Sequence, residues 1–244
     1  MRIIGIIGGM SAESTAKYYA RVNAEVRRRL GGLHNAETVI WSVDFAEIAA
    51  MQSAGDWHQA GRRLADVAHR LERAGADVLV LATNTMHKVA SDIEAAVKIP
   101  LIHIADATAQ KITAAKLKRP GLIATAYTME QEFYTGRLRE RHGLDVVLPN
   151  AEARADIHRI IYDELCKGIV SEASRARYVG YTTDLAAAGA DCLILGCTEV
   201  GMLLDQSRVG LPVFDTTLIH ADAAVDFALS ATENKQGSLA QAAE

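Results

Sequence analysis

The chain has 244 residues, of which 50% are hydrophobic and 23% are charged, with 3 cysteines and a formal net charge of −4. This composition is typical of a globular protein with a substantial core, built as one large or two small domains. The acidic balance and the lack of a Lys/Arg cluster argue against a nucleic-acid partner, and no apolar run is long enough to suggest a membrane protein.

Short apolar runs alternate with longer segments of helical period along the chain. Several runs are continuously apolar, as expected for parallel strands that are covered on both faces. The runs predicted as strands are residues 2–9, 38–45, 77–83, 100–106, 121–126, 145–149, 191–196 and 211–215. We interpret the first run as a strand rather than a signal peptide, because it is short and interrupted by glycine.

Helices are predicted between these strands, which indicates an α/β protein with parallel sheets. One helix is expected to begin after an Asp56 N-cap and to end at Gly75, and a second apolar stripe ends near Gly168. The last residues, TENKQGSLAQAAE (232–244), are expected to form a frayed tail.

Internal similarity indicates a duplication. LERAGADVLVLA (71–82) aligns with LAAAGADCLILG (185–196), and the two copies share AGAD and three leucines. The strand, polar loop and helix of IGIIGGMSAESTAKYY recur in PGLIATAYTMEQEFY, and each half ends in a strand that begins with proline. We therefore predict two pseudo-symmetric halves, each a parallel sheet flanked by helices. The expected domains are residues 1–99 plus 209–244, and residues 100–208.

Equivalent positions of the two copies carry different chemistry. Ligands of such sheets bind beyond the carboxyl ends of the strands, so the active site is expected in the cleft between the halves. Thr83 and Cys197 each come directly after a strand. They are therefore expected on opposite walls of that cleft.

Cys197 is the strongest candidate for a reactive group. It precedes Thr198 and Glu199, where a helix is expected to start, and amides at a helix N-terminus stabilise a thiolate. A buried structural cysteine is the alternative, and it fits Cys166 and Cys192 better, because only Cys197 has a loop position with a partner site in the duplicate. The sparse cysteines lack CxxC spacing, which predicts no disulfide framework, no metal site and a reducing, cytoplasmic setting.

Polar residues near the strand ends could hold an anion. Thr83, Asn84 and Thr85 offer two hydroxyls and an amide, which suit a carboxylate but also serve in ordinary turns. GIIGGMS (5–11) lacks both nucleotide-binding glycine patterns, so we interpret it as a turn whose amides approach a small anion. Lys167 either clamps a carboxylate or interacts with a helix dipole.

Several pieces that span nearly the whole chain resemble the aspartate/glutamate racemase family, the cofactor-independent amino-acid racemases. They are GIIGGMSAEST, LGGLHNAETVIWSVDF, the TNT triplet at 83–85, IIYDELCKG, GADCLILGCTEV and PVFDTTLIHADAAV. The combination of GGMS and GCTE is the specific part. The resemblance implies an isomerase with an amino-acid substrate, an active site between two pseudo-symmetric halves, and usually a homodimer. It implies neither pyridoxal phosphate nor a metal.

The resemblance also assigns roles to residues. Two groups on opposite faces of the α-carbon remove a proton from one face and return one to the other, and the family typically uses two cysteines. The matching catalytic positions are Thr83 and Cys197. Lys167 becomes the candidate partner of the distal carboxylate. The substrate-binding positions are Met10, Gln52, Asn84, Thr85, Tyr127, Thr128, Lys167, Thr198 and Glu199.

Two residues depart from the family pattern: Ala12 replaces a frequent tryptophan, and Thr83 replaces the first cysteine. An alcohol is a far weaker acid than a thiol, so Thr83 is expected to donate a proton, directly or through water, but to accept one poorly. In the family the second cysteine generally faces the L-substrate. We therefore expect Cys197 to take the α-proton of L-aspartate or L-glutamate, with slower or absent activity on the D-enantiomers.

Two other functions stay open at this point. A cleft with a single cysteine could belong to a decarboxylase or isomerase of small dicarboxylates. Alternatively, the chain could be a non-catalytic dicarboxylate-binding protein in which the first cysteine has been lost.

Overall fold

The computed structural model describes residues 1–241, with side chains described through residue 230. The chain divides into two compact units, which are described separately below. Unit 1 contains Met1–Ala82, Val89–Ile102 and His220–Glu244, and unit 2 contains Thr83–Lys88 and His103–Ile219.

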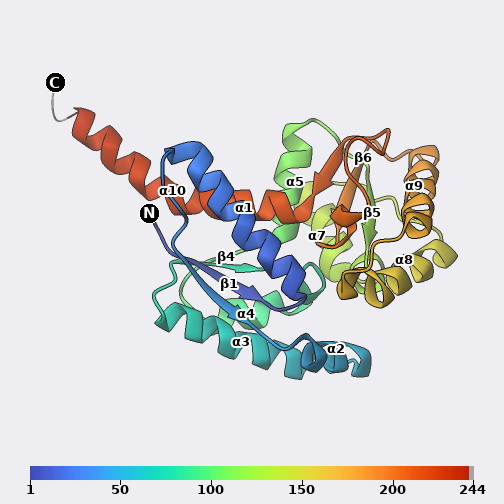
Figure 1. The fold of residues 1–244 in the computed structure, drawn as a ribbon, viewed down its shortest axis with the longest axis horizontal. Helices are drawn as coiled ribbons and strands as arrows, with labels where there is room; N and C mark the ends of the chain where they lie inside the picture. Colours follow the sequence, from blue (N-terminus) through green and yellow to red (C-terminus); the bar gives the residue numbers. More distant parts are fainter. Residues whose placement is uncertain (242–244) are drawn as a thin grey trace. The chain divides into compact units, whose positions relative to one another are not determined.

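The described residues form parallel strands that alternate with helices, as the sequence predicts (Figure 1). The strands are β1 (Ile4–Gly8), β2 (Thr38–Ser42), β3 (Val78–Leu81), β4 (Leu101–Ile102), β5 (Pro120–Ala124), β6 (Cys192–Gly196) and β7 (Val213–Asp215). The α-helices are α1 (Ala12–Leu30), α2 (Phe45–Ala54), α3 (Trp57–Arg73), α4 (Ala90–Ala96), α5 (Ile104–Ala114), α6 (Ala126–Glu130), α7 (Glu132–His142), α8 (Ala151–Asp163), α9 (Glu172–Ala187) and α10 (Thr216–Gln241). Short 3₁₀ helices are η1 (Thr85–Val89), η2 (Leu165–Lys167) and η3 (Val200–Met202).

Unit 1 is a parallel sheet in the order β2-β1-β3-β4, with helices on both faces. Figure 1 shows α3 on one side of this sheet and α1 with α10 on the other. Alternate residues of β1 and β3 pack against α1 and α10, as the two-residue period of a strand requires. This apolar cluster consists of Ile4, Ile6, Tyr18, Val22, Val26, Val78, Val80, Ala82, Ala221, Ala224, Val225, Ala228 and Leu229.

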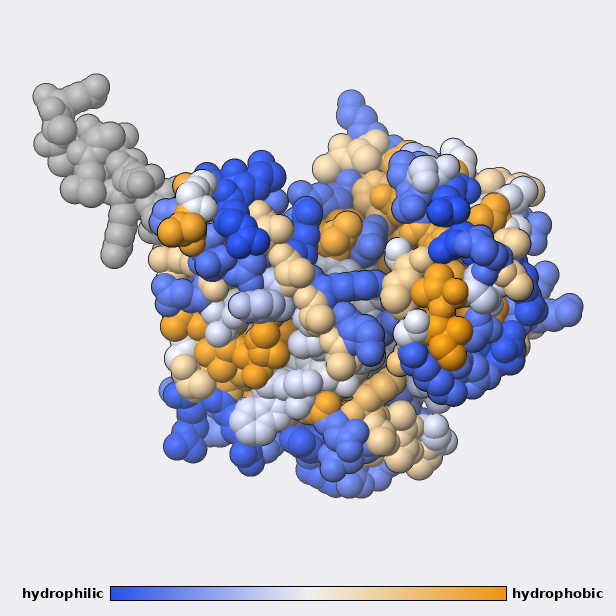
Figure 2. Space-filling view, viewed as in Figure 1, coloured by the Kyte–Doolittle hydropathy of each residue, from blue (hydrophilic) through white to orange (hydrophobic). Residues whose placement is uncertain are grey.

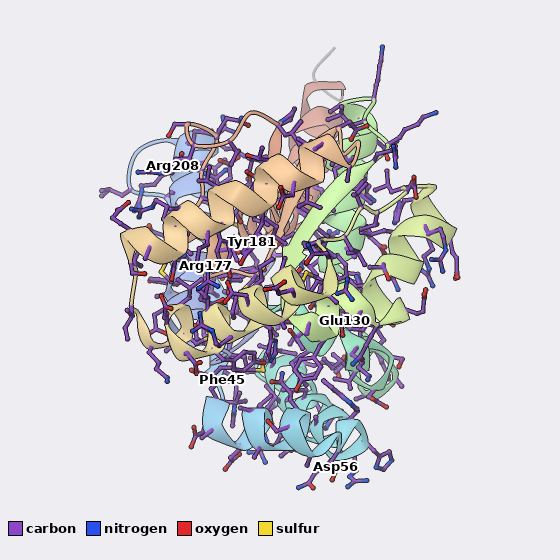
Figure 3. All side chains as sticks on the ribbon, turned by 90° about the vertical axis from the view of Figure 1, so that its right-hand side faces the viewer. Phe45, Asp56, Glu130, Arg177, Tyr181 and Arg208 are labelled. Atoms are coloured by element: carbon purple, nitrogen blue, oxygen red, sulfur yellow. The ribbon has the colours of Figure 1, made fainter. Side chains whose placement is uncertain are left out.

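The predicted helix after Asp56 is confirmed as α3. The Asp56 side chain accepts a hydrogen bond from the Gln59 amide at 3.0 Å and so caps the first turn. Leu64, Val67 and Leu71 lie along its buried face. Figure 3 labels Asp56 where α3 begins, and Phe45 where the preceding helix α2 begins.

Unit 2 is a parallel sheet in the order β5-β6-β7. Its central strand β6 is completely buried, which explains the continuous apolar run in the sequence. Figure 1 shows α5 and α7 on one side of these strands and α8 and α9 on the other. One apolar core joins all four helices to the sheet, so this unit also has three layers.

The compact units differ in three places from the predicted domain boundaries. Residues 100–102 fold with unit 1, because β4 pairs with β3. Residues 209–219 fold with unit 2 because β7 pairs with β6, as in the partners Ile194 and Phe214. Thr83–Lys88 also folds with unit 2, although the strand that precedes it belongs to the sheet of unit 1.

Two smaller predictions need correction. Residues 145–149 form no strand, only an isolated parallel bridge between Val147 and Gly121, because the segment runs beside β5 too briefly. Where the sequence predicts a frayed tail, α10 continues to Gln241, and residues 242–244 lie outside the described part.

The surface carries separate hydrophobic patches among hydrophilic residues on the face drawn in Figure 2. On unit 1, the large exposed apolar side chains include Tyr19, Leu30, Leu33 and Ile40. Among the described residues, no helix combines the length and the apolar character that a membrane crossing requires.

Candidate active site

The segment Thr83–Lys88, here called the Thr83 loop, is anchored by side-chain hydrogen bonds within unit 2. The Thr85 hydroxyl lies 2.9 Å from that of Thr125 and 3.4 Å from that of Thr128. Lys88 Nζ donates to Gln131 Oε1 at 2.5 Å. The loop therefore leaves the end of β3 and is held by the segment that follows β5.

Thr83 lies at the start of this loop and is only 8% exposed. Its carbonyl is 2.8 Å from His87 Nδ1, and the Ile104 amide donates to His87 Nε2 at 3.2 Å. Because Nε2 accepts a hydrogen bond, the proton of a neutral imidazole lies on Nδ1, which donates to the Thr83 carbonyl. His87 thus holds the backbone of Thr83.

Residues 197–202, here called the Cys197 loop, follow β6. Cys197 is 7% exposed, and its thiol donates to Glu199 Oε2 with an S–O distance of 3.1 Å. The Thr198 hydroxyl donates to the same carboxylate oxygen. Glu199 is itself buried, so one carboxylate serves two neighbouring donors inside unit 2.

The state of the Cys197 thiol differs from the sequence-based expectation. Burial raises the pKa of this thiol well above its ordinary value, and the neighbouring Glu199 carboxylate raises it further. The expected helix start is the short 3₁₀ helix η3, which begins only at Val200. The prediction of thiolate stabilisation by a helix N-terminus is therefore wrong for this structure: the thiol keeps its proton and shares it with Glu199.

Asn84 links the two loops through a hydrogen-bond chain. Its Nδ2 donates to Thr216 Oγ1 at 3.0 Å, and the Thr216 hydroxyl donates to the Leu195 carbonyl at 2.8 Å. Leu195 lies two residues before Cys197, at the end of β6. Asn84 is 3% exposed, and within the described part of the chain its Oδ1 has no hydrogen-bond partner.

The other predicted site residues have varied surroundings. Thr128 is fully buried in the threonine cluster with Thr85 and Thr125, and Tyr127 makes an edge contact with the His158 ring at 5.5 Å. Lys167 ends η2 with an exposed side chain that forms no ion pair or hydrogen bond within the described part of the chain. These residues belong to unit 2.

Met10 and Gln52 belong to unit 1, where both side chains are buried. The glycine-rich turn before Met10 has a local structural role. A Cβ atom on Gly9 would lie 2.2 Å from the Val43 carbonyl oxygen, and the Gly9 amide donates to the Thr15 hydroxyl at 2.7 Å. This amide is therefore engaged within unit 1, rather than open to an anion as the sequence suggests.

Sequence reasoning missed Thr125 and Thr216. Both follow a strand directly, as Cys197 does, and this shared position is the signal that could have identified them. His220 is a core residue of unit 1: its ring nitrogens lie 2.7 Å from the Tyr18 hydroxyl and 2.8 Å from the Ile102 carbonyl. In the described part of the chain, no group of three or more His, Cys, Asp or Glu side chains could hold a metal ion.

The sequence model of one family, described as Asp/Glu/hydantoin racemase, matches residues 7–224 of the chain. The chain belongs to this racemase family. Members of the family are isomerases, and the matched region contains both the Thr83 loop and the Cys197 loop.

Solved structures and curated relatives agree with this racemase assignment. The chain is 52% identical to a candidate Asp/Glu racemase from Yersinia pestis, with a TM-score of 0.88 over 94% of this chain and 100% of the other. It is 34% identical to an aspartate racemase homologue from Pyrococcus horikoshii, with a TM-score of 0.80 over 93% and 99% of the two chains. The broad-specificity amino-acid racemase RacX of Bacillus subtilis is 22% identical over 91% of this chain and 96% of its own.

Proposed function

We propose that the chain racemises acidic amino acids without a cofactor, with Cys197 as the base for L-aspartate or L-glutamate and Thr83 as the proton donor on the opposite face. The observation that carries this proposal is the pair of strand-end loops joined by Asn84 and Thr216: one presents a thiol beside a carboxylate, and the other presents an alcohol. Relatives of the chain include a glutamate racemase from Pseudomonas putida and an aspartate racemase homologue from Pyrococcus horikoshii, which supports the acidic class.

Because the raised pKa keeps Cys197 protonated, the thiol must lose its proton before it can act as a base, and Glu199 accepts that proton. The thiol proton moves to the Glu199 carboxylate along the existing hydrogen bond, which leaves a thiolate and a neutral carboxylic acid. The positive α-ammonium group of an amino acid near Cys197 favours this transfer, because an adjacent positive charge stabilises the thiolate. Binding of the substrate therefore generates the base.

The proposed proton transfers form a closed cycle. The Cys197 thiolate takes the α-proton of the L-substrate, which regenerates the thiol and forms a carbanion. The Thr83 hydroxyl, directly or through water, gives a proton to the opposite face of the α-carbon. The proton held by Glu199 returns to Thr83 through water, so the three groups regain their starting states.

The remaining predicted residues bind the substrate in this proposal. Hydroxyl groups of Thr85 and Thr198 hold the α-carboxylate, where negative charge grows as the carbanion forms. The exposed Lys167 ammonium pairs with the distal carboxylate of the substrate. Met10, Gln52, Tyr127 and Thr128 remain predicted contacts of the same substrate.

The unequal groups limit racemisation in a specific way. Because the two enantiomers have equal free energy in solution, kcat/KM must be the same in both directions, and the expectation of slower or absent activity on the D-enantiomers cannot apply to kcat/KM for racemisation. The difference between Cys197 and Thr83 therefore affects how the carbanion is quenched: reprotonation by the Cys197 thiol restores the L-substrate more often than Thr83 forms the D-product. The expected sign of this imbalance is faster α-proton exchange of the L-substrate than of the D-substrate.

Chiral analysis of reaction products tests the function. The chain is incubated separately with L-aspartate, L-glutamate and neutral L-amino acids, and the enantiomers are separated by chiral chromatography. Accumulation of a D-amino acid from an acidic substrate supports the proposal. Release of CO₂ from a small dicarboxylate would instead favour a decarboxylase, and binding of dicarboxylates without any turnover would favour a binding protein.

The proposal includes a homodimer. The exposed apolar side chains of unit 1 include Leu33 at 96% exposure, and burying such groups favours association. Light scattering after size-exclusion chromatography should give twice the chain mass of 26.3 kDa, whereas a monomer mass would contradict this part of the proposal.

A further inference from the structure

Thr216 fixes which atom of the Asn84 amide is available to a ligand. The Leu195 carbonyl can only accept a hydrogen bond, so the Thr216 hydroxyl proton is committed to it at 2.8 Å. The Thr216 oxygen can then only accept from Asn84. The Asn84 atom 3.0 Å away must therefore be the Nδ2 donor, which leaves the carbonyl oxygen Oδ1 on the other side of the amide.

Oδ1 of Asn84 needs a donor. Asn84 is only 3% exposed, and its Oδ1 atom has no hydrogen-bond partner within the described part of the chain. Leaving a buried acceptor without a hydrogen bond destabilises the protein, so this atom favours a ligand that brings a donor group to it. A carboxylate has only acceptors and cannot fill this role, whereas an ammonium group has three donors.

We propose that Thr216 is a positioning residue that holds the Asn84 amide so that Oδ1 accepts a hydrogen bond from the α-ammonium group of the substrate. The inference rests on the proposed function and deepens it. It changes the role of Asn84 from binding the α-carboxylate to recognising the α-amino group. Asn84 and Thr216 together then select amino acids against dicarboxylates that lack an amino group.

Ligand pairs that differ only in the α-amino group test this selection. Isothermal titration calorimetry measures Kd for L-aspartate and succinate, and for L-glutamate and glutarate. In each pair, the Kd of the dicarboxylate divided by the Kd of the amino acid reports recognition of the amino group. Thr216→Val removes the hydroxyl at similar volume and frees the amide to rotate. The ratio should then fall roughly tenfold to a hundredfold, the size expected for a hydrogen bond to a charged group.

Matched variants separate positioning from structure. Thr216→Ser keeps the hydroxyl and should restore the wild-type ratio. Thr182→Val removes another buried threonine hydroxyl, which donates to the Val179 carbonyl of its own helix, and should leave the ratio unchanged. Asn84→Ala tests the same selection from the other partner if Thr216→Val does not fold, and should reduce the ratio to the same extent.

A double variant shows whether Thr216 acts through Asn84. The ratio in Asn84→Ala/Thr216→Val should equal that of Asn84→Ala alone, because no amide remains to be positioned. Equal weakening of both ligands, or an unchanged ratio in Thr216→Val and Asn84→Ala, would overturn the inference while leaving the racemase proposal intact. Failure of the wild-type chain to bind either amino acid would remove the proposed function and this inference with it.

Discussion

The Thr83 loop and the Cys197 loop begin in the same way and then differ. Each follows a buried parallel strand, each starts with a buried residue, and each enters a short 3₁₀ helix. In the Cys197 loop, Glu199 contacts the thiol itself. In the Thr83 loop, His87 contacts the backbone carbonyl of Thr83 and leaves the threonine side chain to other partners.

This difference indicates how a duplicated scaffold can acquire unequal proton chemistry. The first residue of each loop, Thr83 or Cys197, sets the acid strength of the side chain there. The residue that contacts it, His87 four positions later or Glu199 two positions later, determines whether that side chain has a partner for proton exchange. Cys197 has an adjacent proton acceptor, whereas His87 is committed to the backbone between Thr83 and Ile104. The two loops therefore predict one competent base and one weak acid.

Cys197→Ala is expected to have the largest effect, because it removes the base. Exchange of the α-proton of L-aspartate or L-glutamate should fall on the order of 10³-fold or more, measured by proton NMR in heavy water. Cys192→Ala is the matched control: Cys192 is a second buried cysteine, at the opposite end of β6 from Cys197, and its removal should leave most of the exchange. Persistent exchange in Cys197→Ala would show that Cys197 is not the base and that the difference between the two loops does not control catalysis.

Glu199→Gln should have the next largest effect, because it removes the acceptor of the thiol proton. We expect kcat to fall roughly 10²-fold, within the range for general acid–base groups. Glu130→Gln, at a partly exposed carboxylate paired with Arg154, should have little effect.

The same Glu199→Gln variant gives a pH-dependent readout. The buried wild-type thiol has a raised pKa, so alkylation of Cys197 by iodoacetamide should become fast only at pH values above the ordinary range for a thiol. Loss of the neighbouring negative charge lowers the thiol pKa, so the alkylation profile of Glu199→Gln should move to lower pH. An unmoved profile, followed by mass spectrometry of the Cys197 peptide, would contradict the coupling between thiol and carboxylate.

Thr83→Cys should reduce the difference between the two loops. A thiol at this position can accept a proton from the D-substrate, so exchange of the D-enantiomer should increase on the order of 10²-fold. Racemisation should accelerate with equal kcat/KM in both directions. Thr83→Ser retains an alcohol and should keep the wild-type ratio of L to D exchange; a similar gain in both variants would exclude the proposed role of the thiol.

His220→Gln should have the smallest effect on catalysis, because His220 lies outside both loops. Burial lowers the pKa of His220 from 6.5 to about 4. Between these pH values the unfolded chain takes up a proton that the folded chain does not, so this contribution to stability is complete above pH 6.5 and is lost as the pH falls to 4. The loss amounts to about 3 kcal/mol. Denaturant unfolding at several pH values should show a smaller loss in His220→Gln, and equal losses would contradict the assignment.

The sequence predicts the sheets well because their evidence is local. The apolar runs of β1, β3 and β6, and the Asp56 cap of α3, each need only neighbouring residues to be recognised. The positions of the two strand-end loops also follow from the internal repeat.

Features that depend on contacts between distant residues were not predictable. The membership of Thr83–Lys88 in unit 2 depends on Thr125 and Thr216, which are far away in sequence. The raised pKa of Cys197 depends on burial in the apolar core of unit 2, which no local pattern reports. Asn84 was recognised as a polar site residue, but the orientation of its amide required Thr216 and Leu195.

Proton exchange by the unmodified chain tests the central claim most directly. L-aspartate, L-glutamate and their D-enantiomers are each incubated with the protein in heavy water, and loss of the α-proton is followed by NMR while chiral chromatography follows racemisation. The L-substrate should exchange its α-proton faster than it racemises, and the D-substrate should exchange no faster than it racemises. Fast exchange of the D-substrate without exchange of the L-substrate would contradict the assignment of Cys197 and Thr83.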